Sequence, residues 1–332
     1  MLLKRTLLLL VFLLALVSVA FAQDDLVVGQ TFEGNADGET IYYVFRAEAG
    51  KGYIIDLSTP RFDGYLEVRK LDSTSIAYND DFGDSSKSRV FFLLSEDTPL
   101  AVSIGSYSSE DFKGGYTLKV SEAPSSELAY GDTAEVQDTD ATEGYYTFTG
   151  KKDDVINLFV TNDDNDSDTS LSLKLDGVEV TYDYDNGANY FPYIRHYRLP
   201  EDATYLVVLS GYYDNTLSGS VIHLEKTELP TAKLGTPIEI SMTEADYEVV
   251  GIPILDGTSY TVEVAADTTK GTSFTLEITL PGETYSTYYI NVTSLNKASG
   301  TFTATESGTA ILRIVGSSYD PVSLSVTVTE DK

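Results

Sequence analysis

The sequence contains no cysteine, no tryptophan and only two histidines among its 332 residues. Without cysteine, disulfide bonds, a cysteine nucleophile and a lipid-modified cysteine are all excluded. The chain also lacks a Gly-x-Ser-x-Gly elbow, a His-Glu-x-x-His pair and a glycine-rich phosphate loop. No residue is therefore singled out as catalytic, and we expect that the protein is not an enzyme. A carboxylate pair for glycoside hydrolysis stays open as an alternative, because acidic residues are numerous.

Basic residues are scarce relative to acidic ones, with 22 Lys and Arg against 52 Asp and Glu, for a formal net charge of −30. A field of this sign repels phosphate backbones and anionic membranes, so nucleic acid is not an expected partner. It favours cations, including basic protein surfaces and calcium. A solubilising coat for an extracellular or saline milieu explains the charge equally well.

The only long apolar run is N-terminal. Lys4 and Arg5 precede an apolar stretch from Leu7 to Val19, and Ala20-Phe21-Ala22 follows as a small-x-small cleavage site. This pattern predicts a signal peptide over residues 1–22, and the apolar run is short for a membrane anchor, which is the alternative. We expect a secreted protein, extracellular or periplasmic, with no membrane segment after cleavage. The absence of cysteine suits a bacterial secreted protein.

Three similar segments divide the remaining chain. Gly29, Gly131 and Gly235 occur in matching contexts, spaced by 102 and 104 residues. Each interval has the length of one domain. Polar linkers containing Pro124 and Pro230 separate them, which predicts tandem domains over 23–123, 128–226 and 232–330.

Within each repeat, apolar residues alternate with a period of two, which predicts about eight short strands and no helix after the signal. A strand with one apolar face needs a second sheet to cover that face, so the sequence predicts an all-β protein made of three tandem β-sandwich domains. The expected inward positions include Tyr43, Phe45, Ile55, Leu57, Leu100, Val102, Ile104, Leu118, Phe148, Ile156, Leu158, Val207, Leu209, Ile222, Leu224, Tyr260, Val262, Leu312, Ile314, Val326 and Val328.

Acidic residues gather at the ends of two predicted hairpins. In the first, a turn centred between Asp72 and Ser73 places Asp63 opposite residue 82 and beside two further carboxylates. In the second, the Asp176-Gly177 turn places Asp168 opposite Asp185. The corresponding hairpin of the third repeat, around Pro281-Gly282, places Ser273 opposite Ile290 and lacks the acids. The candidate metal ligands are Asp63, Asp80, Asp81, Asp168, Asp183 and Asp185.

Calcium is the cation that these aspartates would favour. Two carboxylates about 4 Å apart repel by up to about 4 kcal/mol at an effective dielectric near 20, and a hard cation with oxygen ligands relieves that repulsion. The alternative is that the aspartates cap turns through hydrogen bonds to the backbone. The acidic run that begins at Asn162 is not an EF-hand loop, because Thr169 and Leu175 stand where glycine and glutamate are required.

Tyrosine doublets recur along the chain. In a strand, successive side chains point to opposite faces, so one member of each doublet is expected in the core and the other at the surface. The outward rings could stack against sugars or partner proteins, although the lack of tryptophan weakens a sugar platform. The doublets are Tyr42-Tyr43, Tyr145-Tyr146, Tyr212-Tyr213 and Tyr288-Tyr289.

Two of the repeats resemble a known family. The motifs at 41–45, 49–53, 63–66, 77–81 and 114–118, and their counterparts at 144–148, 168–171, 183–185 and 219–222, are similar to those of the bacterial pre-peptidase C-terminal domain. The resemblance implies a jelly-roll-like β-sandwich without catalytic activity. Related modules in secreted collagenases bind calcium and substrate fibres. This chain differs in having no peptidase domain.

These observations predict a secreted, non-catalytic array of β-sandwich modules that binds extracellular protein or another extracellular polymer, with calcium as a stabilising ion. A carbohydrate-binding protein that takes polysaccharide is the second hypothesis, and an unrecognised secreted hydrolase is the third.

Overall fold

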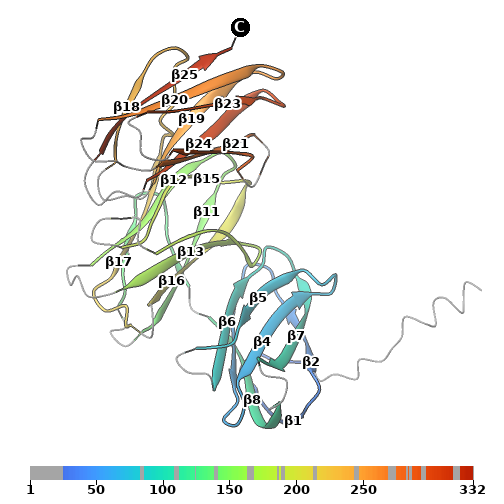
Figure 1. Cartoon of the computed structure of the whole chain (residues 1–332). Helices are drawn as coiled ribbons and strands as arrows, with labels where there is room; N and C mark the ends of the chain where they lie inside the picture. Colours follow the sequence, from blue (N-terminus) through green and yellow to red (C-terminus); the bar gives the residue numbers. More distant parts are fainter. Residues whose placement is uncertain are drawn as a thin grey trace, which may run out of the picture. The chain divides into compact units, whose positions relative to one another are not determined.

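The computed structural model describes most of the chain after the predicted signal peptide. The described residues are 25–82, 86–107, 112–123, 125–137, 141–162, 168–184, 187, 191–211, 215–242, 247–267, 274–281, 283, 286–292, 297–316 and 322–331. These residues form strands, turns and loops only, as predicted (Figure 1). No helix in this part of the chain is long and apolar enough to cross a membrane.

The first pair of sheets, hereafter the first sandwich, contains eight strands in two four-stranded sheets with the orders β1-β8-β3-β6 and β2-β7-β4-β5. This interleaved antiparallel order is that of a jelly roll, as the resemblance implied. The strands are β1 (Thr31–Asp37), β2 (Ile41–Ala47), β3 (Gly52–Ser58), β4 (Gly64–Lys70), β5 (Ser75–Asn79), β6 (Lys87–Leu93), β7 (Thr98–Ser106) and β8 (Lys113–Glu122).

The second sandwich repeats this order and adds one short parallel strand. Its sheets run β10-β17-β12-β15 and β14-β13-β16-β11-β9. The strands are β9 (Ser126–Glu127), β10 (Thr133–Glu135), β11 (Glu143–Gly150), β12 (Val155–Thr161), β13 (Thr169–Leu175), β14 (Val178–Asp183), β15 (Tyr193–Arg198), β16 (Ala203–Gly211) and β17 (Val221–Thr227).

The third sandwich has the same eight-strand order, in sheets β18-β25-β20-β23 and β19-β24-β21-β22. The strands are β18 (Ile238–Met242), β19 (Tyr247–Ile254), β20 (Ser259–Asp267), β21 (Phe274–Thr279), β22 (Tyr288–Val292), β23 (Lys297–Thr303), β24 (Gly308–Gly316) and β25 (Val322–Glu330).

Each sandwich encloses its own hydrophobic core, and each core draws side chains from both of its sheets. Alternate residues are buried along strands such as β2, β7 and β8, as the period of two requires, whereas β12, β16 and β19 are buried almost continuously. The inward positions given above are buried, and many of them are fully buried, including Ile55, Leu100, Ile156, Val207, Val262 and Leu312. Ile41, also expected to point inward, is only partly buried and packs against the first core.

The three glycines that defined the repeats occupy the same structural position. The backbone N–H groups of Gly29, Gly131 and Gly235 donate to the carbonyls of the last strand in their own repeat, at Val120, Leu224 and Val328 respectively, over 2.7–2.8 Å. All three glycines have positive φ angles, of 82°, 94° and 72°. A residue with a Cβ is strained in this conformation, which explains why glycine recurs here.

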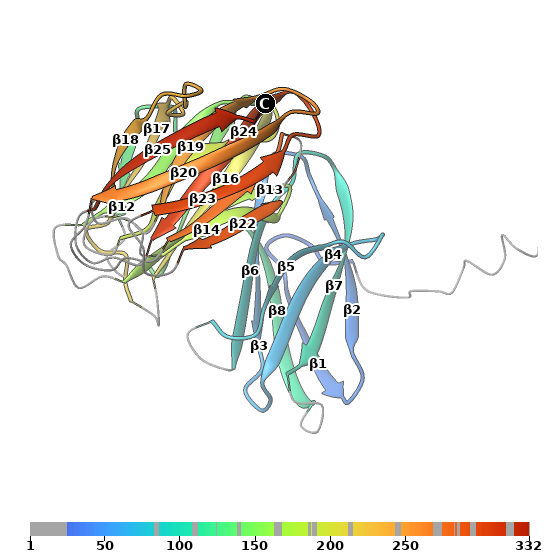
Figure 2. The same cartoon turned by 45° about the horizontal axis from the view of Figure 1, so that its top comes forward.

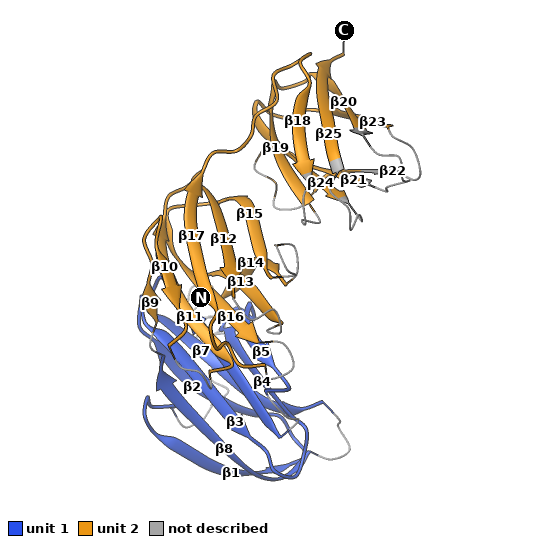
Figure 3. Ribbon diagram, turned by 90° about the vertical axis from the view of Figure 1, so that its left-hand side faces the viewer, with its two compact units in different colours: residues 1–123 blue, residues 124–332 orange. Residues whose placement is uncertain are grey.

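The chain divides into two compact units, Met1–Ala123 and Pro124–Lys332 (Figure 3). The boundary falls at the predicted end of the first domain. The second unit contains the second and third sandwiches, and the division predicted within it, between residues 226 and 232, stays a prediction.

Within the second unit, β15 and β19 contact each other. The Tyr247 hydroxyl accepts a hydrogen bond from the backbone N–H of Arg195 at 2.8 Å and donates one to the carbonyl of Tyr193 at 3.3 Å. β15 is an edge strand, paired only with β12 in the described part of the sheet. The hydroxyl therefore satisfies backbone groups that an edge strand leaves without a strand partner.

Candidate functional site

The register of the first acidic hairpin is as predicted beyond a bulge near its turn. Leu66 lies opposite Asn79 and Glu67 lies opposite Tyr78, in the antiparallel pair of β4 and β5 that Figure 2 shows side by side. The pairing shifts between Val68 and Arg69, so that Arg69 lies opposite Ser75 and not opposite Ile76. The turn is closed by a hydrogen bond from the Ser73 N–H to the carbonyl of Lys70 at 2.9 Å, and Ser73 has a φ of 75°.

Asp63 precedes β4 and Asp80 and Asp81 follow β5, at the end of this hairpin away from the turn. Burial raises the pKa of Asp63, and repulsion from Asp81 and then Asp80 raises it further. The Oδ1 atom of Asp63 is buried and has no hydrogen-bond partner. Asp63 is therefore within electrostatic reach of the two other aspartates at this end of the hairpin.

Strand β6 holds this end of the hairpin in place. The Ser88 hydroxyl donates to the carbonyl of Gly64 at 2.7 Å, and the Arg89 backbone N–H donates to Oδ1 of Asn79 at 3.1 Å. The Arg89 guanidinium pairs with Asp56 at 2.6 Å, with its Cζ 4.2 Å from the centre of the Phe82 ring.

The second hairpin differs from its predicted register by one residue. The Asp176-Gly177 turn is present, with φ angles of 49° and 81°. A bulge between Leu173 and Lys174 shifts the pairing, so that Leu171 lies opposite Asp183 and not opposite Tyr182. Asp168 is therefore not opposite Asp185 in the register that continues beyond the bulge.

Asp183 is bound to the backbone of its own sandwich. Its side chain is 3% exposed, and its Oδ2 accepts a hydrogen bond from the backbone N–H of Tyr193 at 2.7 Å. Asp168 is exposed, and Asp185 lies outside the described residues.

The third hairpin also departs from the prediction. Leu276, not Ser273, lies opposite Ile290. The connection is a loop longer than a Pro-Gly turn, which the Thr287 N–H closes by donating to the carbonyl of Ile278 at 2.8 Å. Ser273 itself lies outside the described residues.

Among the described residues, no group of three acidic or histidine side chains is placed so that it could hold a metal ion. Calcium binding by the six aspartates stays a prediction. In the first hairpin, Asp63 is within electrostatic reach of Asp81 and Asp80.

A second feature of the first sandwich was not predicted as a site. On the outer face of the sheet β2-β7-β4-β5, one row crosses all four strands in the order Tyr42, Ser103, Glu67 and Tyr78. We call this face, together with Tyr65 in the neighbouring row, the tyrosine face. Tyr42 and Tyr78 stand at its two edges, and both are exposed.

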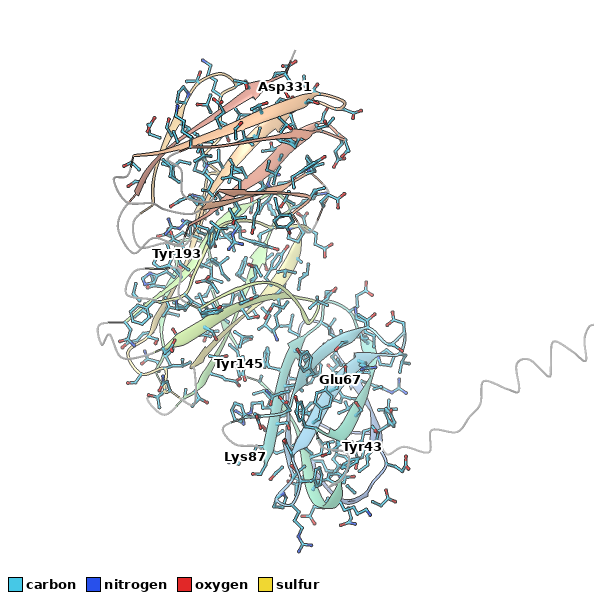
Figure 4. All side chains as sticks on the ribbon, viewed as in Figure 1. Tyr43, Glu67, Lys87, Tyr145, Tyr193 and Asp331 are labelled. Atoms are coloured by element: carbon cyan, nitrogen blue, oxygen red, sulfur yellow. The ribbon has the colours of Figure 1, made fainter. Side chains whose placement is uncertain are left out.

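Glu67 is the polar centre of the tyrosine face, and Figure 4 labels it. Its side chain is buried and forms an ion pair with the Arg69 Nε at 2.6 Å. The Ser75 hydroxyl donates to the same carboxylate at 3.1 Å. The pair fixes Arg69 on the outer face, where its side chain is 48% exposed.

Tyr65 and Tyr78 stack on each other beside this pair. Their ring centres are 6.2 Å apart and their planes differ by 28°. Burial raises the pKa of the Tyr65 hydroxyl, and the neighbouring Glu67, Tyr78 and Asp80 raise it further. Asp80 therefore links the tyrosine face to the acidic end of the hairpin.

The doublet prediction is confirmed for two of the three described doublets. Tyr43 is buried and Tyr42 is exposed, while Tyr288 packs against the third core and Tyr289 is exposed. In the remaining one, Tyr146 is buried but Tyr145 is half-buried. Tyr212-Tyr213 lies outside the described residues. Tyr65 and Tyr78 were missed because they belong to no doublet, although alternation with Leu66 and Val68 indicates that Tyr65 points outward.

The two histidines have different surroundings. His223 stacks on Phe159, with ring centres 4.5 Å apart, and its Nε2 lies 2.8 Å from the Thr161 hydroxyl. His196 occupies the bulge of β15 with a φ of 49°, and its backbone N–H donates to Asn157. Burial lowers the pKa of both imidazoles.

No family model and no curated protein matches the chain. Among solved structures, the chain is similar to the pre-peptidase C-terminal domain of a collagenase from Bacillus anthracis, at 16% identity and a TM-score of 0.27, over 31% of this chain and 95% of that one. It is also similar to a periplasmic inhibitor of g-type lysozyme from Aeromonas hydrophila, at 12% identity and a TM-score of 0.23, over 31% and 98%.

A third similarity spans more of the chain. A triple jelly-roll protein of an archaeal virus turret matches over 92% of this chain and 82% of its own, at 11% identity and a TM-score of 0.21. These are similarities of fold only.

Proposed function

We propose that the protein is a secreted, non-catalytic array of β-sandwich modules that binds an extracellular polymer or protein through the tyrosine face of its first sandwich. The observation that carries the proposal is the row Tyr42, Ser103, Glu67, Tyr78 on an outer sheet surface. Outward tyrosines on strands present large, rigid and amphipathic contact area, which recognition surfaces favour.

The middle of the tyrosine face is built from small residues. Strand β7 contributes Ala101, Ser103 and Gly105 to the outer surface, between Tyr42 on β2 and Tyr65 on β4. A ligand chain that lies across the sheet could therefore contact both edges without obstruction from the centre. Buried Glu67 and half-exposed Arg69 supply hydrogen-bonding groups of fixed orientation.

A carbohydrate ligand is the second candidate, because the stacked pair of Tyr65 and Tyr78 exposes ring surface on which a sugar could stack. The net charge of −30 disfavours polyanionic polysaccharides, so a neutral polysaccharide is the form this candidate takes.

Co-sedimentation with insoluble polymers tests the proposal. The chain from Gln23 to Lys332 would be incubated with fibrous protein, cellulose, chitin and bacterial cell wall, and the bound fraction measured. We expect saturable binding to at least one polymer, and a loss of binding in the Tyr42→Ser, Tyr78→Ser double variant.

Tyr107 provides the matched control, because it is an exposed tyrosine of the same sandwich that lies outside the row and is 76% exposed. Tyr107→Ser should bind like the unchanged protein. Equal binding by the double variant and the control would contradict the proposal.

A further inference from the structure

Strand β15 of the second sandwich meets the third sandwich at a bulge. Its register against β12 shifts there, so that Arg195 and His196 together lie opposite Asn157. The N–H groups of the two bulge residues donate in different directions. That of Arg195 donates to the Tyr247 hydroxyl of the third sandwich at 2.8 Å. That of His196 donates to Oδ1 of Asn157, in its own sandwich, at 2.9 Å.

Two residues of β19 contact this bulge from the third sandwich. Tyr247 is 8% exposed although it does not belong to the third core, and its hydroxyl also donates to the carbonyl of Tyr193, which Figure 4 labels. Glu248 pairs with the Arg195 guanidinium, and both side chains are largely buried. The contact between the two sandwiches therefore depends on the conformation of the bulge.

The bulge accommodates His196 only as a neutral ring. Its φ of 49° lies in the left-handed region, which costs a residue with a Cβ some energy. Its Nδ1 atom is buried and has no hydrogen-bond partner among the described residues. A protonated imidazole donates from both ring nitrogens, so protonation in this position would bury a donor without an acceptor.

The surrounding charges act in the same direction. Burial lowers the pKa of His196, and the neighbouring Arg195 guanidinium lowers it further. The carboxylate of Glu248 is already paired with Arg195. The other charged side chains that act on the two tyrosines of this contact are Asp183 on β14, Glu225 on β17 and Arg313 on β24.

We infer that the contact between the second and third sandwiches is an acid-sensitive junction, in which protonation of His196 opens the bulge of β15 and releases the third sandwich. A charged ring must leave its buried position to be solvated, and the change of backbone at His196 displaces the Arg195 N–H from the Tyr247 hydroxyl. This inference concerns the unit of residues 124–332 and does not depend on the tyrosine face.

The linkage of proton binding to opening gives the direction of the effect. Because the pKa of His196 is lowered in the closed junction, closure is fully favoured above the ordinary histidine pKa of about 6.5. As the pH falls below that value, the ratio of closed to open molecules decreases by up to about tenfold per pH unit. Glu248 has the opposite sign, because burial raises its pKa and its protonation favours closure. Opening in mild acid would therefore be due to the histidine and not to this carboxylate.

A distance between two spin labels measures the opening. The chain has no cysteine, so Lys152→Cys in the second sandwich and Glu306→Cys in the third provide one labelling pair at exposed positions. Double electron–electron resonance on the chain from Gln23 to Lys332 should give a narrow distance distribution at a pH of about 7.5. At a pH of about 5, the ratio of open to closed molecules should rise by about tenfold, as a second and broader population.

Three variants assign the response. His196→Asn cannot ionise and tolerates a positive φ, so its junction should stay closed at both pH values. His223→Asn removes the other histidine of the chain, which stacks on Phe159, and should open like the parent. Tyr247→Phe lacks the hydroxyl that binds the bulge and should be more open at both pH values.

A measurement without substitution at the junction completes the test. The imidazole proton signals of His196, identified by their loss in His196→Asn, give the midpoint of its protonation, which should coincide with the midpoint of opening. A distance distribution that does not change with pH, two midpoints that differ, or an undiminished pH response in His196→Asn would each overturn the inference. If His196→Asn is open at neutral pH, like Tyr247→Phe, the comparison of the two midpoints decides.

Discussion

Arg195 of the second sandwich forms an ion pair with Glu248 of the third, and the two side chains are only 16% and 10% exposed. The Arg195 guanidinium also lies over the Tyr193 ring, with its Cζ 4.4 Å from the ring centre. Burial raises the pKa of Glu248, and Arg195 opposes that rise. Each of the two charges therefore offsets the cost of burying the other.

We predict that Arg195→Met destabilises the unit formed by residues 124–332 by about 3 kcal/mol at pH 7, because it leaves the Glu248 carboxylate buried without a partner. Chemical denaturation would measure the loss. The Arg195→Met, Glu248→Leu double variant should recover most of it, because no charge is then left buried. Equal destabilisation in the single and double variants would show that lost packing, not the uncompensated charge, is responsible.

The contact between β15 and β19 also affects whether the second and third sandwiches fold independently. Residues 128–226 contain a complete core, so we expect this fragment to fold with a sheet spectrum and one cooperative transition. Without Tyr247, the edge of β15 loses two hydrogen bonds. The melting temperature of the fragment should therefore lie below that of the same sandwich within residues 124–332. A disordered fragment would mean that the second and third sandwiches depend on each other to fold.

Asp63 should oppose folding at neutral pH. Because its pKa is raised in the folded state above the ordinary value of an aspartic acid, its contribution to stability is fully present below a pH of about 4 and is lost as the pH rises through the folded-state pKa. We predict that Asp63→Asn, which cannot ionise, raises the melting temperature at pH 7 by a few degrees and has little effect near pH 3.

Asp72 serves as a control for Asp63, because its pKa is lowered in the folded state and not raised. A hydrogen bond from the Thr74 N–H, 2.9 Å long, lowers the pKa of Asp72, so its contribution is present above the unfolded-state pKa and is lost as the pH falls through the folded-state value. Asp72→Asn should not stabilise the protein at pH 7. A rise in melting temperature for both variants would point to a general relief of negative charge and not to the position of Asp63.

Local patterns were sufficient for the strands and for one register. The prediction that Leu66 lies opposite Asn79 is correct, although the bulge between Val68 and Arg69 shifts the pairing nearest the turn. Neither this bulge, nor the one at Lys174, nor the long loop beyond Ile278 has a signal in the sequence, and a single extra residue changes every pairing after it.

The tyrosine face could not be predicted in the same way. Tyr42 and Tyr78 belong to β2 and β5, which are joined only through β7 and β4. Their common row depends on the order of the strands and on three successive registers, none of which follows from alternation within one strand. The doublet pattern predicted that one tyrosine of each pair points outward, but it missed Tyr65 and Tyr78, and the sheet order determines which outward tyrosines form one surface.

The response to calcium should now be confined to the first sandwich. There, Asp80 and Asp81 both repel the carboxylate of Asp63. In the second sandwich, Asp183 is instead buried and accepts a hydrogen bond from the backbone. Calcium would relieve the repulsion at Asp63, and binding would require Asp80 or Asp81 to move toward it, because no set of ligands converges among the described residues. A ligand that binds only the folded state stabilises it by about 2.7 kcal/mol at a hundredfold excess over Kd.

Melting of residues 23–123 and of residues 124–332, with and without millimolar calcium at constant ionic strength, measures this effect separately in the two compact units. We expect a higher melting temperature for the first unit alone, and Asp81→Ala should remove the gain, because it deletes the larger of the two repulsions on Asp63. Equal shifts in both units would indicate nonspecific screening of the acidic surface. No shift in either unit would show that the aspartates of the first hairpin serve only in turn formation. Asp63 would then destabilise the fold locally, because its carboxylate is repelled by those of Asp80 and Asp81.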